Sequence, residues 1–341
     1  MYLFYFSRNL FFLCFFLFEF SSLVSQNTVN EPAGILFYNV ENFFNPDHNE
    51  GKDDLEFTPD GERGWNRYRQ ITKENNICRV ILYAGKWNPP VLVGLCEVED
   101  QEVLKSLIFN TGLHYLGYSV EHFESPDRRG VDVALLYRTG RFKVLKSVPQ
   151  KVYLGSESGP TRDILYVKGV LDGRDTLHVM VNHWPSRWGG EMVTKSKRKM
   201  ASNVLRNLCD SILQSNPNAA IVAMGDFNDG PGDESIRNLG GCLFNLAENI
   251  EGEFPGTLKY RHEWNCFDQI LVSSGLLPDG EVKKLVLSNK KMKIISAPFM
   301  MEDDPQFPGK RLKRTYLGYQ YLGGFSDHLP VYVELIREAS L

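Results

Sequence analysis

The stretch Gly324-Phe-Ser-Asp-His-Leu-Pro-Val331 places an acid–histidine pair, Asp327–His328, directly in front of an alternating apolar run. A second stretch, Val222-Ala-Met-Gly-Asp-Phe-Asn-Asp229, places Asp226 and Asn228 at the end of another apolar run. Apolar runs of this length predict strands, so both polar groups belong to strand ends. One group rich in carboxylate and one that carries an imidazole indicate a metal-assisted site that moves protons.

Apolar runs of strand length recur along the chain. Several alternate between apolar and polar residues, which is typical of half-buried antiparallel strands. Apolar residues at helical spacing predict one helix over residues 194–214, and we expect another over residues 66–83. The expected strands are residues 35–38, 91–95, 131–137, 164–170, 177–181, 220–224, 267–272 and 329–335.

The composition is that of a soluble globular protein, with 43% hydrophobic and 23% charged residues among 341. A formal net charge of -4 argues against an indiscriminately cationic, histone-like surface. A local basic surface patch can still bind nucleic acid in a protein that is acidic as a whole. Because no linker or repeat interrupts the chain, we expect one α/β domain over residues 26–341, with stacked sheets flanked by helices.

The first 25 residues read as an export signal. Arg8 precedes an apolar core at residues 9–18, and small residues at 21–25 offer a cleavage point after Ser25. Glu19 interrupts the apolar run, which makes it a poor membrane span; an uncleaved anchor is the alternative. We therefore expect an exported mature chain without a membrane span.

Cysteine usage gives no metal or disulfide signature. Without Cys14, which lies in the signal, five cysteines remain, and none forms a zinc-type doublet. An exported protein can form a disulfide, but the spacing of the cysteines does not identify a bonded pair. We therefore expect mostly buried free thiols. The five are Cys78, Cys96, Cys209, Cys242 and Cys266.

Polar side chains stand at the ends of the expected strands. Those that close a strand are Asn39, Glu97, His183, Asp226 and Asn228. Asp268 and His328 instead stand near the beginnings of their strands. If these two strands run antiparallel to the others, all these side chains gather at one edge of the sheets, the usual place for a site.

Each of these residues also has a plainer interpretation. Asn39 fits a strand-end turn, Glu97 a helix-initiating carboxylate, and His183 a packed surface histidine. Asp226 and Asn228 fit a hairpin turn. Burial of a carboxylate after four apolar strand positions is costly without a cation, however. Because the plainer interpretations together require several independent coincidences, we favour a catalytic site.

Six segments in this order resemble the endonuclease/exonuclease/phosphatase superfamily, which includes pancreatic deoxyribonuclease, abasic-site endonucleases, neutral sphingomyelinases and inositol polyphosphate 5-phosphatases. The segments are Tyr38-Asn-Val-Glu-Asn42, Leu95-Cys-Glu97, Asn182-His183, Gly225-Asp-Phe-Asn228, Phe267-Asp268 and Ser326-Asp-His-Leu-Pro330. The resemblance implies a four-layer α/β/β/α sandwich of two mostly antiparallel sheets. It also implies divalent-metal-dependent cleavage of phosphate esters.

The resemblance further implies a centre for Mg²⁺ or Mn²⁺. Glu97 is expected to bind the ion as a carboxylate ligand for a hard cation. Asn39 is expected to hold the metal or a phosphate oxygen, and Asp327 to make a further metal contact. Glu41 stands where abasic-site enzymes have an aspartate, so its longer side chain departs from that pattern.

The catalytic roles implied by the resemblance fall on five residues. His183 and His328 would flank the phosphorus, and Asp268 would orient His328 and stabilise its protonated form. Asp226 would position or deprotonate the attacking water, and Asn228 would hydrogen-bond the pentacovalent phosphate. The choice of base between Asp226 and His328 stays open.

Two arginines are candidate substrate contacts. Arg129 precedes the strand at 131–137 and would contact a phosphate; a polar hairpin loop is the alternative. Arg187 belongs to a basic group after His183, which fits either a grip on a polyanion or a solvated helix face. The other members of that group are Lys195, Lys197, Arg198 and Lys199.

The substrate class is the least determined property. Asn265-Cys-Phe-Asp268 and Ala223-Met-Gly-Asp226 depart from the motifs of the 5-phosphatase branch. Trp184 and Trp188 keep a sphingomyelinase-like activity open. We expect an exported, monomeric endonuclease that acts on nucleic acid and has no stable protein partner. A non-catalytic binding descendant of the fold is the alternative from a different class.

Overall fold

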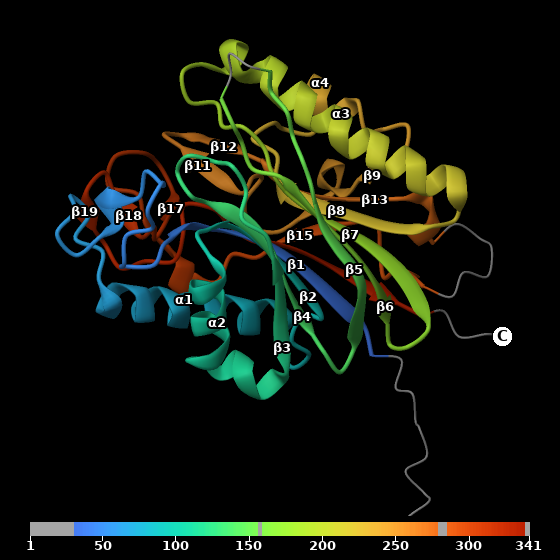
Figure 1. The fold of residues 1–341 in the computed structure, drawn as a ribbon, viewed down its shortest axis with the longest axis horizontal. Coiled ribbons are helices and arrows are strands. Elements are labelled where there is room, and N and C mark those ends of the chain that lie inside the picture. Colours follow the sequence, from blue (N-terminus) through green and yellow to red (C-terminus); the bar gives the residue numbers. More distant parts are fainter. Residues whose placement is uncertain (1–30, 156–158, 279–284, 338–341) are drawn as a thin grey trace, which may run out of the picture. The chain divides into compact units, whose positions relative to one another are not determined.

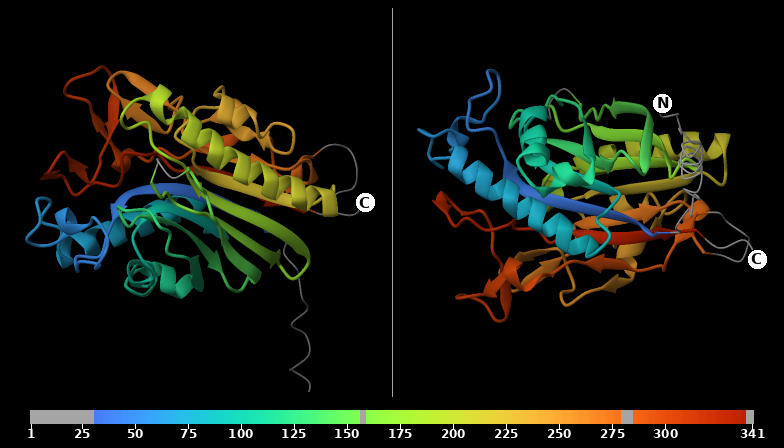
Figure 2. Two further views of the ribbon diagram at one scale, coloured as in Figure 1. Left: turned by 45° about the horizontal axis from the view of Figure 1, so that its top comes forward. Right: turned by 90° about the horizontal axis from the view of Figure 1, so that it is seen from below.

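Two β-sheets face one another and carry helices on their outer faces (Figures 1 and 2). The computed structural model describes residues 31–155, 159–278 and 285–337. Pro32–Leu341 forms one compact unit. The predicted signal peptide, residues 1–25, lies outside the described residues.

The first sheet has the strand order β10-β15-β20-β1-β2-β4-β3, and β14 also pairs with β20. Pairing is antiparallel except between β1 and β2 and between β10 and β15. The strands are β1 (Ala33–Phe43), β2 (Leu92–Val98), β3 (Tyr118–His122), β4 (Asp132–Arg138), β10 (Ile250–Glu251), β14 (Val286–Leu287), β15 (Met292–Ile294) and β20 (Val331–Ile336).

The second sheet has the order β5-β6-β7-β8-β13-β9, and only β7 and β8 pair in parallel. Its strands are β5 (Phe142–Gln150), β6 (Ile164–Leu171), β7 (Asp175–His183), β8 (Ala220–Asp226), β9 (Phe244–Asn245) and β13 (Asp268–Val272). Three short hairpins stand apart from both sheets: β11–β12 (Leu258–Tyr260, Glu263–Asn265), β16–β17 (Met301–Asp303, Lys310–Leu312) and β18–β19 (Tyr316–Leu317, Gln320–Tyr321).

Two of the helices begin after residues whose side chains cap them. Asn66 caps α1 (Arg67–Gly85) by accepting from the Arg69 amide, and Asp100 caps α2 (Gln101–Phe109) by accepting from the Val103 amide. Both lie on the side of the first sheet, and α3 (Glu191–Ser215) lies on the side of the second (Figure 1). The remaining helices are α4 (Glu234–Arg237) and the short 3-10 turns Leu55–Phe57, Gly112–Leu116, Leu246–Glu248, Ser274–Leu276 and Pro298–Met300.

The main core lies between the two sheets. A β-carbon on Gly94 of β2 would come within 2.9 Å of the Met224 side chain of β8 and 3.1 Å of Phe37 of β1. Gly94 therefore permits the close approach of the two sheets. A second apolar cluster joins β8 of the other sheet to α3 through Ile221, Ala223, Leu205 and Cys209. These layers confirm the four-layer α/β/β/α sandwich.

Two further expectations concern the described residues. Cys78, Cys96, Cys209, Cys242 and Cys266 are buried free thiols, which confirms that expectation within this part of the chain. In the same residues, every helix is too short or too polar to cross a membrane.

Candidate active site

Three site residues lie side by side on neighbouring strands of the second sheet. His183 at the end of β7 is the cross-strand partner of Asp226 at the end of β8. Asp226 in turn pairs with Asp268, the first residue of β13. Because β13 runs antiparallel to β8, the beginning of one strand meets the end of the other, as expected from the sequence.

The first sheet supplies Asn39 and Glu97 to the same place. β1 and β2 run in parallel, and their register shifts where Glu97 leaves the ladder. Glu97 has φ 60°, and Glu41 and Asn42 have φ 52° and 53°. Non-glycine residues seldom adopt this left-handed conformation, which is costly and concentrates at functional sites. β20 runs antiparallel to β1, so His328, just before β20, joins this edge.

Asp226 is the centre of the cluster. Its Oδ2 accepts a hydrogen bond from Nδ2 of Asn39 at 3.1 Å. The Nε2 atoms of His183 and His328 lie 3.8 and 3.9 Å from the same oxygen, too far for hydrogen bonds. The two imidazoles thus converge on one carboxylate oxygen without bonding to it. Burial raises the pKa of Asp226 to about 7.

His328 has a fixed orientation. Its Nδ1 lies 2.6 Å from Oδ2 of Asp268, and its backbone amide donates to Oγ of Ser326. Burial alone would lower the pKa of His328, but Asp268 and Asp226 outweigh burial and hold this pKa well above its ordinary value. The arrangement favours the imidazolium form, with Nε2–H directed into the cluster.

His183 has a different environment. Burial and the nearby Arg162 and Arg129 hold the pKa of His183 well below its ordinary value. Within the described residues its Nδ1 is buried and has no hydrogen-bond partner. The two imidazoles therefore differ in protonation: His183 is neutral while His328 is charged.

Glu97 and Asp226 form the donor set best suited to a divalent cation. Asn39 bridges them, because its Nδ2 lies 3.3 Å from Oε1 of Glu97 and 3.1 Å from Oδ2 of Asp226. The other oxygen of Glu97 accepts from the Asn42 amide. Two adjacent carboxylates in a largely buried site repel one another unless a cation lies between them. Oxygen donors of this kind suit Mg²⁺ or Mn²⁺.

Asp327 and Glu41 are joined by Arg314, which donates to Oδ2 of Asp327 at 2.8 Å and to Oε1 of Glu41 at 3.1 Å. The other oxygen of Glu41 accepts from the Thr315 amide. Glu41 therefore anchors the segment after β17. The metal role of Asp327 remains a prediction.

Asn228 lies at the cluster but is engaged with the backbone. It has φ 52°, and its Nδ2 donates to the carbonyl of Trp184 at 3.1 Å. Arg162, which sequence reasoning missed, donates to the same carbonyl at 2.8 Å and pairs with Asp127 at 3.0 Å. A signal for Arg162 existed, because it stands in the polar segment directly before β6. The phosphate contact expected of Asn228 remains a prediction.

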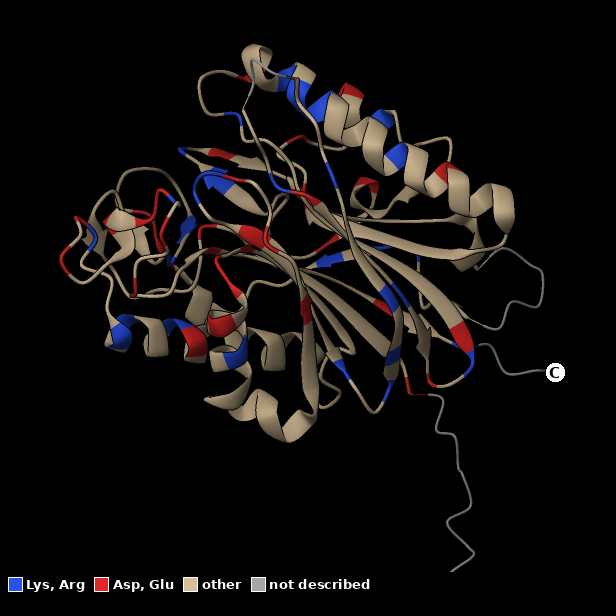
Figure 3. Ribbon diagram, in the orientation of Figure 1, with Lys and Arg blue, Asp and Glu red and all other residues tan. Residues whose placement is uncertain are grey.

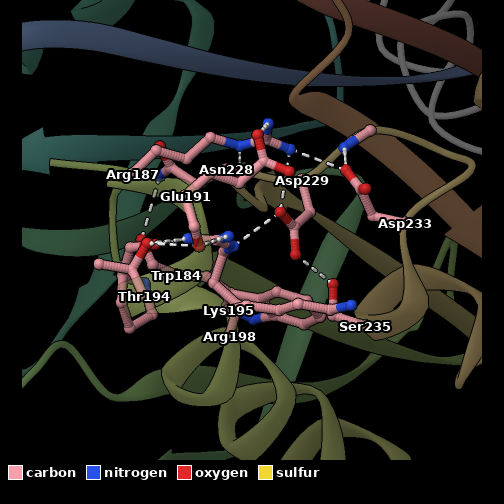
Figure 4. Close-up of polar contacts among 12 residues, drawn as sticks. Trp184, Arg187, Glu191, Thr194, Lys195, Arg198, Asn228, Asp229, Asp233 and Ser235 are labelled. Atoms are coloured by element: carbon pink, nitrogen blue, oxygen red, sulfur yellow. Dashed lines mark hydrogen bonds and ion pairs between the residues drawn. The ribbon is translucent and has the colours of Figure 1, made fainter. Parts of the chain in front are cut away.

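Arg129 and Arg187 lie in different settings. Arg129 donates to Oδ1 of Asn42 at 2.8 Å and lies 3.9 Å from Glu97, with its side chain about half exposed. Arg187 donates to the Asn228 carbonyl and to three carboxylates, those of Glu191, Asp229 and Asp233 (Figure 4). Arg129 is free to meet a substrate, whereas the nitrogens of Arg187 already have protein partners.

Within the basic group on α3, Arg198 differs from both interpretations of the sequence, whereas Lys195 and Lys199 lie at the surface. Arg198 is fully buried and pairs with Asp229 at 2.7 Å, so it is neither a solvated side chain nor part of a cationic surface (Figure 4). Lys195 and Lys199 both pair with Glu234 of α4. The acidic residues of α3 itself stand near its two ends, Glu191 and Asp210, with the basic residues between them (Figure 3). These lysines therefore form part of a mixed-charge surface.

Comparisons with known proteins agree with this geometry. The profile of the endonuclease/exonuclease/phosphatase family matches residues 34–337. No curated protein matches the chain in sequence. Among solved structures, the catalytic domain of human Nocturnin with bound sulfate is similar with a TM-score of 0.55 and 16% identity, over 90% of this chain and 95% of that chain.

Two further solved structures share the fold. TDP2 from Caenorhabditis elegans has a TM-score of 0.56 and 15% identity, over 89% of this chain and 75% of that chain. The mannosyl-6-phosphatase of Bacteroides thetaiotaomicron VPI-5482 has a TM-score of 0.53 and 15% identity, over 89% of this chain and 99% of that chain. With a family match across nearly all of the compact unit and a cluster of the expected residue types at one sheet edge, the protein belongs to the endonuclease/exonuclease/phosphatase family of phosphoesterases.

Proposed function

We propose that the protein hydrolyses phosphodiester bonds of nucleic acid with the help of Mg²⁺ or Mn²⁺. The observation that carries the proposal is the convergence of His183 and His328 on Oδ2 of Asp226, at 3.8 and 3.9 Å, beside Glu97. The gap between these groups suits a phosphoryl oxygen or a water. The sulfate in the Nocturnin structure supports the binding of a tetrahedral oxyanion by this fold.

The protein groups divide the work of hydrolysis. Charged His328 donates a hydrogen bond from Nε2 to a phosphoryl oxygen, and Asp268 holds the imidazolium in place. Neutral His183 orients the same phosphate from the neighbouring strand. Because His328 is already protonated, Asp226 is the proton acceptor for the attacking water.

Glu97 would hold the metal ion, with Asn39 beside it and Asp226 next to it as the proton acceptor. When bound, the ion polarises the phosphoryl oxygen and offsets the negative charge of the transition state. Arg129 offers a further positive charge, since it lies 3.9 Å from Glu97 and is half exposed. We further propose that the mature chain is exported after cleavage near Ser25, on the strength of residues 1–25.

A phosphomonoesterase is the second candidate. Lys195 and Lys199 pair with Glu234, and Arg198 is buried. These contacts weaken the case for an extended surface that binds a polyanion. The Bacteroides neighbour is a mannosyl-6-phosphatase. A small phosphorylated substrate needs few cations outside the centre.

The purified protein should be assayed with Mg²⁺ or Mn²⁺ on duplex DNA, RNA, sphingomyelin, bis(p-nitrophenyl) phosphate, p-nitrophenyl phosphate and mannose 6-phosphate. We expect the diesters to be cleaved and DNA or RNA to be preferred over sphingomyelin. Hydrolysis of the monoesters with no cleavage of any diester would instead assign the protein to the second candidate. The Glu97→Gln variant controls for contaminating hydrolases.

A further inference from the structure

A second group of metal-type ligands lies where β3 ends and β4 begins. His122 is the last residue of β3, Asp132 is the first of β4, and Glu124 belongs to the loop between them. Each offers one ligand atom, and the three atoms lie within 4.8 Å of one another. These residues are separate from the catalytic cluster described above.

The buried atoms of this group lack ordinary partners. Within the described part of the chain, neither Nε2 of His122 nor Oδ2 of Asp132 has a hydrogen-bond partner. Their side chains are only 3% and 1% exposed, and the two atoms lie 3.5 Å apart. Buried polar atoms are rarely left without a partner, so this pair requires an explanation.

The distance between Nε2 of His122 and Oδ2 of Asp132 fits two ligands of one metal ion better than a direct hydrogen bond. A hydrogen bond would place nitrogen and oxygen about 2.9 Å apart. Two ligands at about 2.1 Å from a tetrahedral ion lie about 3.4 Å from each other. The observed 3.5 Å is close to the second value.

The donor set and its surroundings indicate the class of ion. One imidazole and two carboxylates suit zinc and related transition metals, whereas Mg²⁺ and Ca²⁺ prefer oxygen ligands alone. The Glu124 side chain is 51% exposed, which leaves an entry path for the ion and room for a water ligand. Lys52 pairs with Oε2 of Glu124 at 3.3 Å and offsets part of the negative charge.

We propose that His122, Asp132 and Glu124 bind a zinc-class divalent cation that fixes the loop 123–131. The other oxygen of Asp132 already holds this loop by accepting from the Ser125 amide at 3.0 Å. The loop carries Arg129 to Asn42. The ion thus has a structural role, because it joins both ends of the segment that presents Arg129.

The test measures zinc content instead of turnover, so its result does not depend on the proposed substrate. The full chain is incubated with Zn²⁺ in a large excess of Mg²⁺, added to compete for the proposed catalytic centre, and zinc is determined after gel filtration. We expect one zinc per chain in the wild type. His122→Ala and Asp132→Asn should reduce the zinc content at least tenfold.

Two matched controls should keep the zinc. His114→Ala removes an exposed imidazole, and His183→Ala removes the imidazole of the catalytic cluster. If His122→Ala does not fold, as judged by circular dichroism, Asp132→Asn decides the question. A wild type that binds no zinc, or zinc retained by folded Asp132→Asn, would reduce His122–Asp132 to a plain ion pair and overturn the proposal.

Discussion

Nδ1 of His328 and Oδ2 of Asp268 lie 2.6 Å apart, although sixty residues separate them in the chain. The contact joins β13 of one sheet to the segment before β20 of the other. It fixes the ring of His328 and favours its charged form, because a buried carboxylate stabilises an imidazolium beside it. One ion pair therefore sets both the position and the protonation of a catalytic group.

Removal of this ion pair should damage turnover more than substrate binding. His328→Ala should lower kcat at least about a hundredfold, the low end for a general acid–base group. Asp268→Asn should lower kcat by a similar factor, since it withdraws the charge while it keeps the shape. Steady-state kinetics of each variant, on the substrate that the wild type cleaves best, measure kcat and KM. Near-normal turnover in His328→Ala would show that the site is assigned wrongly.

Glu97→Gln should abolish most activity and leave the fold intact. The substitution keeps the size of the side chain but removes the charge that would attract the metal ion. Chelation of the wild type should have the same effect, and Mg²⁺ or Mn²⁺ should restore the rate. Full hydrolysis in excess chelator, with negligible metal content, would contradict metal dependence.

The stability of the chelated protein should fall as the pH rises from about 4 to about 7. The pKa of Asp226 is raised to about 7, so the folded state holds a proton that the unfolded state has lost in this window. One such group changes the free energy of unfolding by at most about 1.4 kcal/mol per pH unit. Denaturant titrations at several pH values measure this change. In Asp226→Asn, the free energy of unfolding should fall less steeply with rising pH. Equal slopes in both proteins would argue against the raised pKa.

Arg198→Ala should reduce the free energy of unfolding by about 2–3 kcal/mol, because it removes the fully buried cation beside Asp229 and its packing, while Arg187 and Ser235 still bind that carboxylate. The matched control, Lys197→Ala on the same helix, should change it by less than about 0.5 kcal/mol. Chemical denaturation measures both. A small effect of Arg198→Ala would indicate that the buried pair is dispensable.

Binding of DNA should depend on Arg129 more than on the lysines of α3. Lys195 and Lys199 are already paired with Glu234, so their replacement by Gln should barely change the salt dependence. Arg129→Gln should lower the slope of log K against log salt by about 1. The comparison is best made in a Glu97→Gln background without metal, where no cleavage occurs. A large change in this slope on replacement of the lysines alone would show that α3 binds the polyanion.

Strand order and polarity account for most of what the sequence predicts. The alternation around Val331–Ile336 and the run before Asp226 identify strands, and antiparallel pairing then brings Asp268 and His328 to the edge reached by Glu97. The less apolar edge strand β5 and the short helix α2 carry weaker patterns, and neither was predicted. The cap of α2, Asp100, stands two residues after the end of β2, the strand that carries Glu97.

Other features depend on distant contacts that no local pattern contains. The left-handed backbone of Glu97 coincides with the register shift between β2 and β4. Lys195 and Lys199 meet Glu234 only because α4 packs against α3. The sequence groups Arg198 with the surface cations, since the rest of α3 and the whole of β8 separate it from its partner Asp229. Burial and pairing at this range are tertiary properties.

The close contact at Gly94 has a consequence for substrate size. His183 is fixed to one sheet and His328 precedes a strand of the other, so the gap between their imidazoles depends on how far apart the sheets lie. Met224, two residues before Asp226, fills the space that Gly94 leaves open. Apolar substitutions at this contact would change the distance between the sheets, and with it the size of oxyanion that fits, without replacing any catalytic residue.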